Sequence, residues 1–218
     1  MTAALGDEYE RTRIRRLPEK QVTDRAALDA VLDAARVAHL ATSDSAGQPY
    51  VIPVAYARDR DHVLVHGSTG SRLFRALAAG VPTCLTVTIL DGLVLARSAF
   101  ESSMHYRSAM VLGSCESVPD DDVPRSLKVL TEHLMPGRWA DLRPPTPKEL
   151  AATTLLRMPL TEWSVKVSDG WPDDPPDDLD APVWAGVLPL RSQFGAPRPA
   201  PDLRAPYDVP HYVYEWTP

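Results

Sequence analysis

The chain has 218 residues, of which 44% are hydrophobic and 24% charged, so it is long enough to bury a core and ordinary in composition for a globular protein. Lys and Arg number 23 against 29 Asp and Glu, and this net charge of −6 excludes a broad attraction to nucleic acid. Six of the acids lie between Asp169 and Asp180, a stretch without basic residues, so the surplus acid belongs to one segment.

Two cysteines, Cys84 and Cys115, are too few for a disulfide scaffold or a cysteine zinc cluster, and both lie in apolar sequence where a buried free thiol is usual. No HExxH, zinc-knuckle or GxSxG pattern occurs, and we expect no metal site. There is no apolar run of 18 residues and no signal-peptide core, so we expect a cytoplasmic protein with no membrane partner.

Three regions follow from the composition along the chain. Residues 1–22 predict an N-terminal arm, whose basic cluster at Arg11, Arg13, Arg15 and Arg16 either contacts a phosphate or a partner subunit, or is simply solvated. Residues 23–194 predict one domain with an acidic, proline-rich loop at 171–182. Residues 195–218, which proline punctuates, predict an extended C-terminal tail.

Hydrophobic periodicity and turn residues predict the elements in chain order. The expected helices begin at Thr23 or Asp24 and end near Val37, follow Ser71 as far as Gly80, and cover about 122–134 and 147–152. The expected strands are 39–42, 50–56, 62–66, 83–90, 93–96, 106–118 and 153–167.

Two details of these strands affect the fold. Pro53 lies inside a strand, and because proline removes a ladder donor we expect that strand to be an edge or to be interrupted there. Asp91-Gly92 predicts a hairpin turn. Tight turns, rather than helices, connect most strands, which excludes a doubly wound parallel sheet and predicts a mainly β fold, an antiparallel β-barrel with flanking helices.

The segment from Val63 to Arg72 carries the clearest indication of a site. A strand leads into a Gly, Ser and Thr loop that enters a helix, where free N–H groups and the helix dipole favour an anion. Ser68, Thr69 and Ser71 add hydroxyl donors, and Arg72 can grip a phosphate. Equally, Ser71 can be an ordinary N-cap and Arg72 an exposed first-turn residue. The loop lacks the length and the lysine of a P-loop.

The runs Gly47–Val54, Val65–Arg72 and Met104–Gly113 resemble the pyridoxamine 5′-phosphate oxidase-like family of FMN-binding split barrels, nearest to its nitroimidazole-resistance branch. The resemblance covers about residues 10–190. It implies a six-stranded split barrel that forms a homodimer, with FMN in the groove between the subunits.

Carried over from that family, four side chains would hold the FMN phosphate: His66, Ser68, Ser71 and Arg72. The resemblance also implies that backbone groups of four consecutive residues border the flavin ring: Ile52, Pro53, Val54 and Ala55. Ser108 matches a polar residue that reaches FMN from a later strand. Many members carry a second basic residue directly after the arginine, where this chain has Leu73.

Four further residues have two interpretations each. His39 is either a packed, hydrogen-bonded histidine or a catalyst, and His105 either a solvated loop residue or a ligand of substrate or haem iron. Lys166 either faces the flavin or lies on the surface, and Trp184 either caps a ring from the partner subunit or packs in the core.

Two functional hypotheses remain from the sequence. The first is an FMN-dependent oxidoreductase that passes electrons from a reduced nicotinamide to a small flat acceptor, such as a nitro compound, a quinone or a pyridoxamine-phosphate-like substrate. The second is a carrier or sensor that binds FMN, haem or a deazaflavin without turnover.

Overall fold

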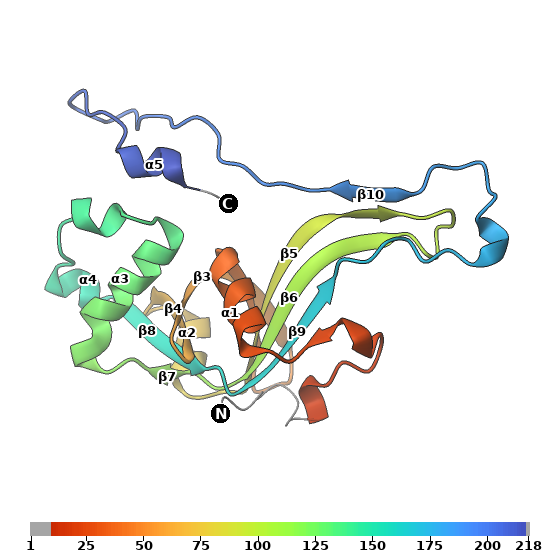
Figure 1. Cartoon of the computed structure of the whole chain (residues 1–218). Coiled ribbons are helices and arrows are strands. Elements are labelled where there is room, and N and C mark those ends of the chain that lie inside the picture. Colours follow the sequence, from red (N-terminus) through yellow and green to blue (C-terminus); the bar gives the residue numbers. More distant parts are fainter. Residues whose placement is uncertain (1–9, 217–218) are drawn as a thin grey trace.

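The computed structural model describes residues 10–216, in which ten strands form one antiparallel sheet and helices flank it (Figure 1). The strands are β1 (Gln21–Val22), β2 (Val37–Ser43), β3 (Pro49–Asp59), β4 (His62–Ser68), β5 (Thr83–Leu95), β6 (Ser103–Gly113), β7 (Glu116–Ser117), β8 (Thr153–Pro159), β9 (Glu162–Ser168) and β10 (Gly186–Pro189). The helices are α1 (Arg25–Ala34), α2 (Arg72–Ala78), α3 (Val123–Leu134), α4 (Pro147–Ala151) and α5 (His211–Glu215). The prediction of a mainly β fold is confirmed.

The strand order is β1-β9-β6-β5-β2-β3-β4-β8-β7, with β10 paired to β5. β3 joins two halves of this sheet, because Pro49 to Ala55 pair with β2 whereas Tyr56 to Asp59 pair with β4. β3 runs through Pro53 without a break, and among the described residues its part up to Ala55 pairs with β2 on one side only, so of the two predicted alternatives the edge strand is confirmed and the interruption is not. Without the three short strands β1, β7 and β10, seven strands remain, one more than the six expected.

Helix α1 packs its apolar stripe against the inner face of the sheet. Leu28, Val31 and Leu32 are fully or almost fully buried, in one cluster with core side chains that include Trp163 of β9. Asp24 caps the helix by accepting from Ala26 N. The helix ends at Ala34, three residues before the expected Val37, because the backbone becomes extended and leads into β2.

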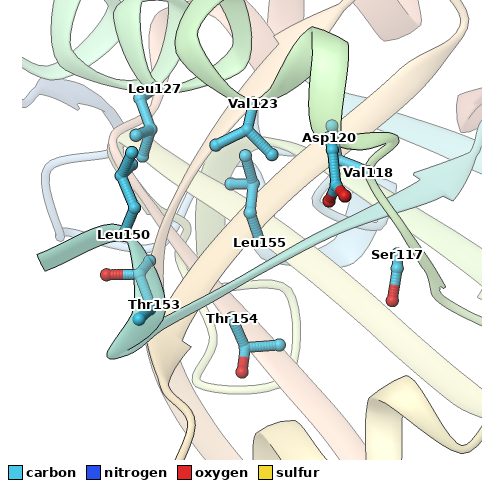
Figure 2. Close-up of a pocket in the computed structure, with 10 residues that line it drawn as sticks. Ser117, Val118, Asp120, Val123, Leu127, Leu150, Thr153, Thr154 and Leu155 are labelled. Atoms are coloured by element: carbon cyan, nitrogen blue, oxygen red, sulfur yellow. The ribbon is translucent and has the colours of Figure 1, made fainter. Parts of the chain in front are cut away.

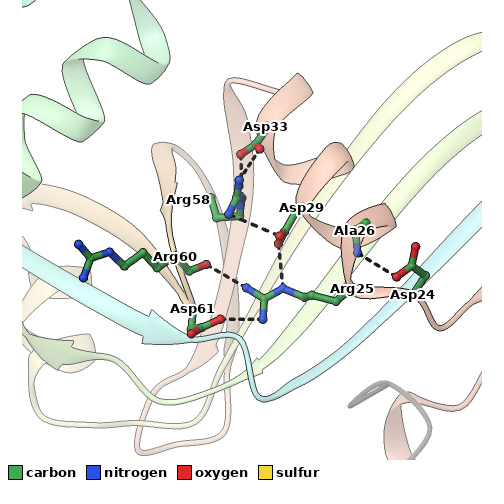
Figure 3. Close-up of polar contacts among 8 residues, drawn as sticks. All are labelled: Asp24, Arg25, Ala26, Asp29, Asp33, Arg58, Arg60 and Asp61. Carbon is green, nitrogen blue, oxygen red and sulfur yellow. Dashed lines mark hydrogen bonds and ion pairs between the residues drawn. The ribbon is translucent and has the colours of Figure 1, made fainter. Parts of the chain in front are cut away.

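Ion pairs connect α1 to the turn between β3 and β4 (Figure 3). Arg25 donates to Asp29 at 2.8 Å and lies 2.9 Å from Asp61, while Arg58 donates to Asp33. Each such partly exposed pair stabilises the fold only slightly, but together they fix the position of α1 across the sheet.

Strands β5 and β6 form a long hairpin that projects from the barrel (Figure 1). The prediction of a turn at Asp91-Gly92 is wrong: β5 continues to Leu95, and the register shifts by a bulge between Leu90 and Gly92. A Cβ at Gly92 would lie 2.8 Å from the Leu188 carbonyl oxygen of β10, so the glycine permits a close approach of two strands. The Asp91-Gly92 pair therefore lies at the bulge, and the turn between β5 and β6 follows Leu95.

The N-terminal arm, as far as it is described, lies along β9. β1 pairs with β9, Arg11 forms an ion pair with Glu162, and Lys20 Nζ donates to Ser168 Oγ at 3.0 Å. The expectation of a solvated cluster therefore does not hold for Arg11. The first nine residues of the predicted arm lie outside the described residues.

The C-terminal tail extends from β10 and ends in α5, a helix that the sequence analysis did not predict. Tyr212 of α5 donates to Asp141 at 2.5 Å, and Trp216 Nε1 donates to the Pro136 carbonyl at 2.8 Å. Among residues 10–216, none of the helices is long and apolar enough to cross a membrane.

Candidate functional site

A pocket of about 240 Å³ lies between α2 and the first half of β3. Its lining includes Asp44, Tyr50, Ile52, Ser71, Arg72 and Leu73. Strand alternation explains the contribution of β3, because Tyr50 and Ile52 lie on one face, opposite Thr42 and Leu40 of β2. This pocket brings three predicted residues together, namely Ile52, Ser71 and Arg72.

The loop before α2 is held by its own hydrogen bonds. Thr69 N donates to the Ala152 carbonyl at 3.0 Å, and Gly70 N donates to Ser68 Oγ at 3.2 Å. Ser71 Oγ accepts from Phe74 N at 3.4 Å and so caps the helix. The N-cap interpretation of Ser71 is confirmed, and the hydroxyl proton of this cap stays free to donate to an anion.

Gly67 gives this loop its shape. A Cβ at this position would lie 2.3 Å from the Phe74 ring, so only glycine lets the helix seat Phe74 against the end of β4. Phe74 is 5% exposed and belongs to the barrel core. The position of Arg72 on the first turn of α2 therefore depends on core packing.

Arg72 Cζ lies 5.0 Å from the centroid of the Tyr50 ring, within the range of a cation–π contact. Tyr50 OH donates to Asp44 Oδ2 at 3.2 Å. Asp44 also accepts from the backbone N–H groups of Ala46 and Gln48, and these bonds, with a smaller contribution from Arg72, lower the pKa of its carboxyl group. The pocket thus holds one cation and one carboxylate.

The first half of β3 leaves one edge free next to this pocket. From Pro49 to Ala55 the strand pairs with β2 on one side, and its pairing with β4 begins only at Tyr56. Backbone groups of the predicted residues Pro53, Val54 and Ala55 therefore lie along a strand edge that is unpaired within residues 10–216. Such an edge offers N–H and C=O groups to the rim of a flat ring.

His66 lies at the end of β4 with an exposed side chain, opposite Leu155 of β8. Desolvation lowers the pKa of His66, which disfavours its charged form. Leu73 lines the pocket and packs against the core.

Ser108 and Lys166 are direct neighbours across β6 and β9. They lie on the outer face of the sheet, since the alternating residues Ala109 and Val165 are buried in the core. Lys166 Nζ donates to the Arg16 carbonyl of the N-terminal arm at 3.4 Å. Because β5 and β2 separate β6 from β3, and β9 lies one strand further, Ser108 and Lys166 lie about 14 Å and about 19 Å from β3 along the sheet of one chain.

His39 lies on the same outer face, in one row with Pro53, Thr86 and Met110. Its side chain is exposed, and no hydrogen bond to its ring occurs within the described part of the chain. The interpretation of His39 as a packed, hydrogen-bonded residue does not hold within residues 10–216, because no described element covers that face of β2.

His105 and Trp184 both lie near the end of the β5–β6 hairpin. The Nε2 atom of His105 is 2.8 Å from the Gly170 carbonyl oxygen, a contact that ties β6 to the acidic loop. Trp184 is exposed and lies against Gly186, so it is not a core residue.

A larger pocket of about 490 Å³ lies on the other side of the barrel, between α3, α4 and β8 (Figure 2). Asp120 and Ser117 line one end, and apolar side chains such as Leu127 and Leu155 line the rest. It contains none of the predicted site residues and no cation. Among residues 10–216 no group of three or more His, Cys, Asp or Glu side chains is placed to hold a metal ion.

The pocket between α2 and the first half of β3 is here called the β3 pocket. Two of its residues, Asp44 and Tyr50, were not assigned a role from the sequence. Tyr50 could have been found, because it alternates with Ile52 toward the same face. Asp44 could not, since a turn aspartate has an ordinary structural role in that position.

A family model described as pyridoxamine 5′-phosphate oxidase matches residues 24–167. The chain belongs to this family. No curated protein matches the sequence.

Two solved structures resemble this family member over nearly its whole length. The FAD and haem binding protein from Mycobacterium smegmatis is 46% identical, with a TM-score of 0.87 over 91% of this chain and 97% of that one. A flavocytochrome from Azotobacter vinelandii is 37% identical, with a TM-score of 0.89 over 95% of this chain and 97% of that one. A candidate 5-nitroimidazole antibiotic resistance protein from Bacteroides thetaiotaomicron shares the fold, at 20% identity and a TM-score of 0.57 over 67% and 86% of the two chains.

Proposed function

We propose that this protein is a flavin-dependent oxidoreductase that acts as a homodimer. Arg72 and Ser71 would hold the phosphate of the FMN portion, and the free edge of β3 would border the flavin ring. The flavin would take electrons from a reduced nicotinamide and deliver them to a small flat acceptor, such as a nitro compound, a quinone or a pyridoxamine-phosphate-like substrate.

The observation that carries this proposal is the Arg72 guanidinium at a pocket that opens beside the unpaired edge of β3. A flavin requires a cation and hydroxyl donors at its phosphate, and Arg72 with the free proton of Ser71 supplies both. It also requires backbone donors and acceptors along the ring, which an unpaired strand edge supplies. The residues present therefore fit a flavin.

The two similar structures support a flavin, and the first of them favours FAD over free FMN. One is of an FAD and haem binding protein and the other of a flavocytochrome. FAD contains the FMN portion, so the same phosphate pocket serves either cofactor. A further pocket adjoins the one between α2 and β3 and shares Thr42, Ser43 and Asp44 with it. This pocket extends over Cys84 and Leu112 on the outer face, which leaves space for an adenylate group.

Exposed apolar side chains on the outer face of the sheet support the homodimer. Val37 and Val51 are more than half exposed there, beside His39 and Pro53. Ser108 and Lys166, about 14 Å and about 19 Å from β3 along the sheet of their own chain, would reach the flavin of a partner subunit.

The test is to purify the protein and record its visible absorption. A bound flavin gives its characteristic absorption band, and mass spectrometry of the released molecule distinguishes FMN, FAD and a deazaflavin. Oxidation of NADH or NADPH with a nitro acceptor or quinone then has to exceed the rate given by free flavin. A colourless protein that does not bind added FMN or FAD contradicts the proposal.

A second candidate function is a haem- and flavin-binding electron carrier without substrate turnover. His39 favours it, because this exposed ring has no hydrogen bond within residues 10–216 and lies among apolar neighbours on the outer face. His105 is a weaker choice of ligand, since the contact with Gly170 occupies one of its ring nitrogens. Addition of haem gives a Soret band if this function is correct, and His39→Ala would remove or shift that band.

A further inference from the structure

Two surface segments at opposite ends of the folded molecule have complementary chemistry. The first, here called the tail loop, is residues 195–209, and the second, here called the hairpin tip, is residues 96–104 with 169–184. Figure 1 shows the tail loop near α5 and the hairpin tip beyond the far ends of β5 and β6. The two segments of one chain therefore cannot meet.

The tail loop is rich in proline, carries two arginines and two aspartates (Asp202 and Asp208) so that its net charge is zero, and is not packed against its own chain. It contains Pro197, Pro199, Pro201 and Pro206, and every residue from 195 to 204 is exposed. Its only hydrogen bonds within the described chain are local ones, such as Leu203 N to the Ala200 carbonyl at 3.1 Å. Prolines restrict the free chain, so this loop loses little entropy when it binds a partner.

Two arginines of the tail loop are without a partner. The side chains of Arg198 and Arg204 form no hydrogen bond or ion pair within residues 10–216. Anchors on both sides hold the loop, because Phe194 packs against Arg36 and Trp216, and Tyr212 bonds to Asp141. The loop is thus presented at a fixed place.

The hairpin tip differs from the tail loop in having exposed aromatic rings and a surplus of acidic residues. Phe100, Trp171 and Trp184 are 88%, 80% and 69% exposed. Asp177 and Asp180 form no side-chain hydrogen bond or ion pair within the described residues.

Two contacts hold the tip together as one surface. Asp174 accepts from Arg97 N at 2.8 Å and pairs with the Arg97 side chain at 3.0 Å, and His105 contacts the Gly170 carbonyl. The acidic segment is therefore fixed to the turn that carries Phe100.

We infer that the tail loop of each subunit binds the hairpin tip of a second copy of this chain. Exposed aromatic rings bind proline-rich segments by stacking on their rings and extended backbone, and neighbouring carboxylates add pairs with arginine. The tail loop supplies the prolines and arginines, and the tip supplies the rings and carboxylates.

A second copy also fits the geometry of the chain. The two segments lie at opposite ends, so a twofold axis would place each tail loop against the partner's tip and form the same contact twice. The inference rests on the homodimer of the proposed function and adds which surfaces hold it together.

The test uses two variants of the full chain with opposite charge changes. One carries Arg198→Glu and Arg204→Glu in the tail loop, and the other carries Asp177→Arg and Asp180→Arg at the tip. Homodimers of either variant place like charges opposite each other. In a heterodimer of the two variants, the altered tail loop of one chain faces the altered tip of the other, and the native tail loop faces the native tip. Both contacts therefore join opposite charges at the substituted positions.

The two variants are co-expressed with tags of different mass, and native mass spectrometry measures the dimers. We expect the ratio of heterodimers to homodimers to exceed the statistical ratio by about tenfold or more, because like charges in contact are strongly unfavourable. The matched control pair, Lys148→Glu with Asp121→Arg, alters exposed residues away from both segments and should give the statistical ratio.

The possible outcomes are distinct. A statistical ratio for the first pair overturns this inference and leaves the dimer standing. A wild-type chain that is monomeric overturns both this inference and the homodimer. Visible absorption of the same samples reports flavin binding separately, and it also shows that the variants are folded.

Discussion

The guanidinium of Arg72 lies over the ring of Tyr50, with 5.0 Å between Cζ and the ring centroid. This contact holds the only cation among the side chains that line the β3 pocket, at the start of a helix. Tyr50 in turn bonds to Asp44, so an aromatic ring separates the cation from the nearest carboxylate.

Replacement of Arg72 tests the phosphate site directly. Arg72→Ala should weaken flavin binding about tenfold or more, because a charge-assisted contact with phosphate contributes about 1.5–3 kcal/mol. Titration of the unloaded protein with FMN and FAD, followed by fluorescence quenching, measures the change. Arg75→Ala, on the next turn of α2 with an exposed side chain, is the matched control and should bind as the wild type does.

Asp44 should oppose the binding of an anion in the same pocket. Asp44→Asn keeps an acceptor for Ala46 N and Gln48 N but removes the negative charge near Arg72. We expect flavin to bind a few-fold more tightly, at low ionic strength above all, because the charges are exposed and salt screens them. If Asp44→Asn binds flavin as tightly as the wild type or more weakly at every salt concentration, the Asp44 carboxylate stabilises the turn and does not oppose the ligand.

Gly67 connects the core to the pocket. Gly67→Ala places a methyl group into the Phe74 ring, which must move with α2, and we expect a loss of about 1–3 kcal/mol in the free energy of unfolding. Urea unfolding measures the loss. Flavin affinity should fall as well, since Arg72 lies on the same short helix. Gly170→Ala, where a Cβ would meet nothing, should leave both quantities unchanged.

Glu149 predicts a stability change at acid pH. Bonds from Arg143 and Thr146 lower the pKa of Glu149 to about 2 from its ordinary value of 4.5. A carboxyl whose pKa is lower in the folded state stabilises the fold above the unfolded pKa and loses this contribution as the pH falls. The loss therefore takes place between about pH 4.5 and pH 2.

Glu149→Gln should remove this part of the acid dependence. The variant keeps a side chain that can bond to Thr146, so its stability should change less than that of the wild type across this window. Chemical unfolding at a series of pH values from 5 downward measures both curves. Parallel curves for the two proteins would mean that Glu149 does not contribute.

Much of the fold follows from local patterns in the sequence. Proline at a first helical turn and an amphipathic stripe predict the helix at about 122–134, close to the observed Val123–Leu134. A tight turn at Arg60 and Asp61 joins β3 to β4, between the strands expected at 50–56 and 62–66, and Arg60 there adopts the left-handed backbone that such a turn requires.

The rest depends on contacts between distant segments, which periodicity does not reveal. Gly92 resembles a turn glycine, and only the approach of Leu188 from the tail shows that it permits a bulge. His39 resembles a buried strand residue, yet no other element among the described residues covers the outer face of β2. Ser71 and Arg72 were recognised, and alternation with Ile52 could have added Tyr50, whereas Asp44 acquires a role only when the folded chain brings it to the same pocket as α2.

Pro53 has one further consequence for the protein before it acquires a ligand. A strand edge without a partner tends to pair with the same edge of another molecule and so to start aggregation. Proline offers no N–H group to such a foreign strand. Its position in the unpaired part of β3 therefore protects newly made chains from joining edge to edge, while the same edge stays open to a small flat molecule.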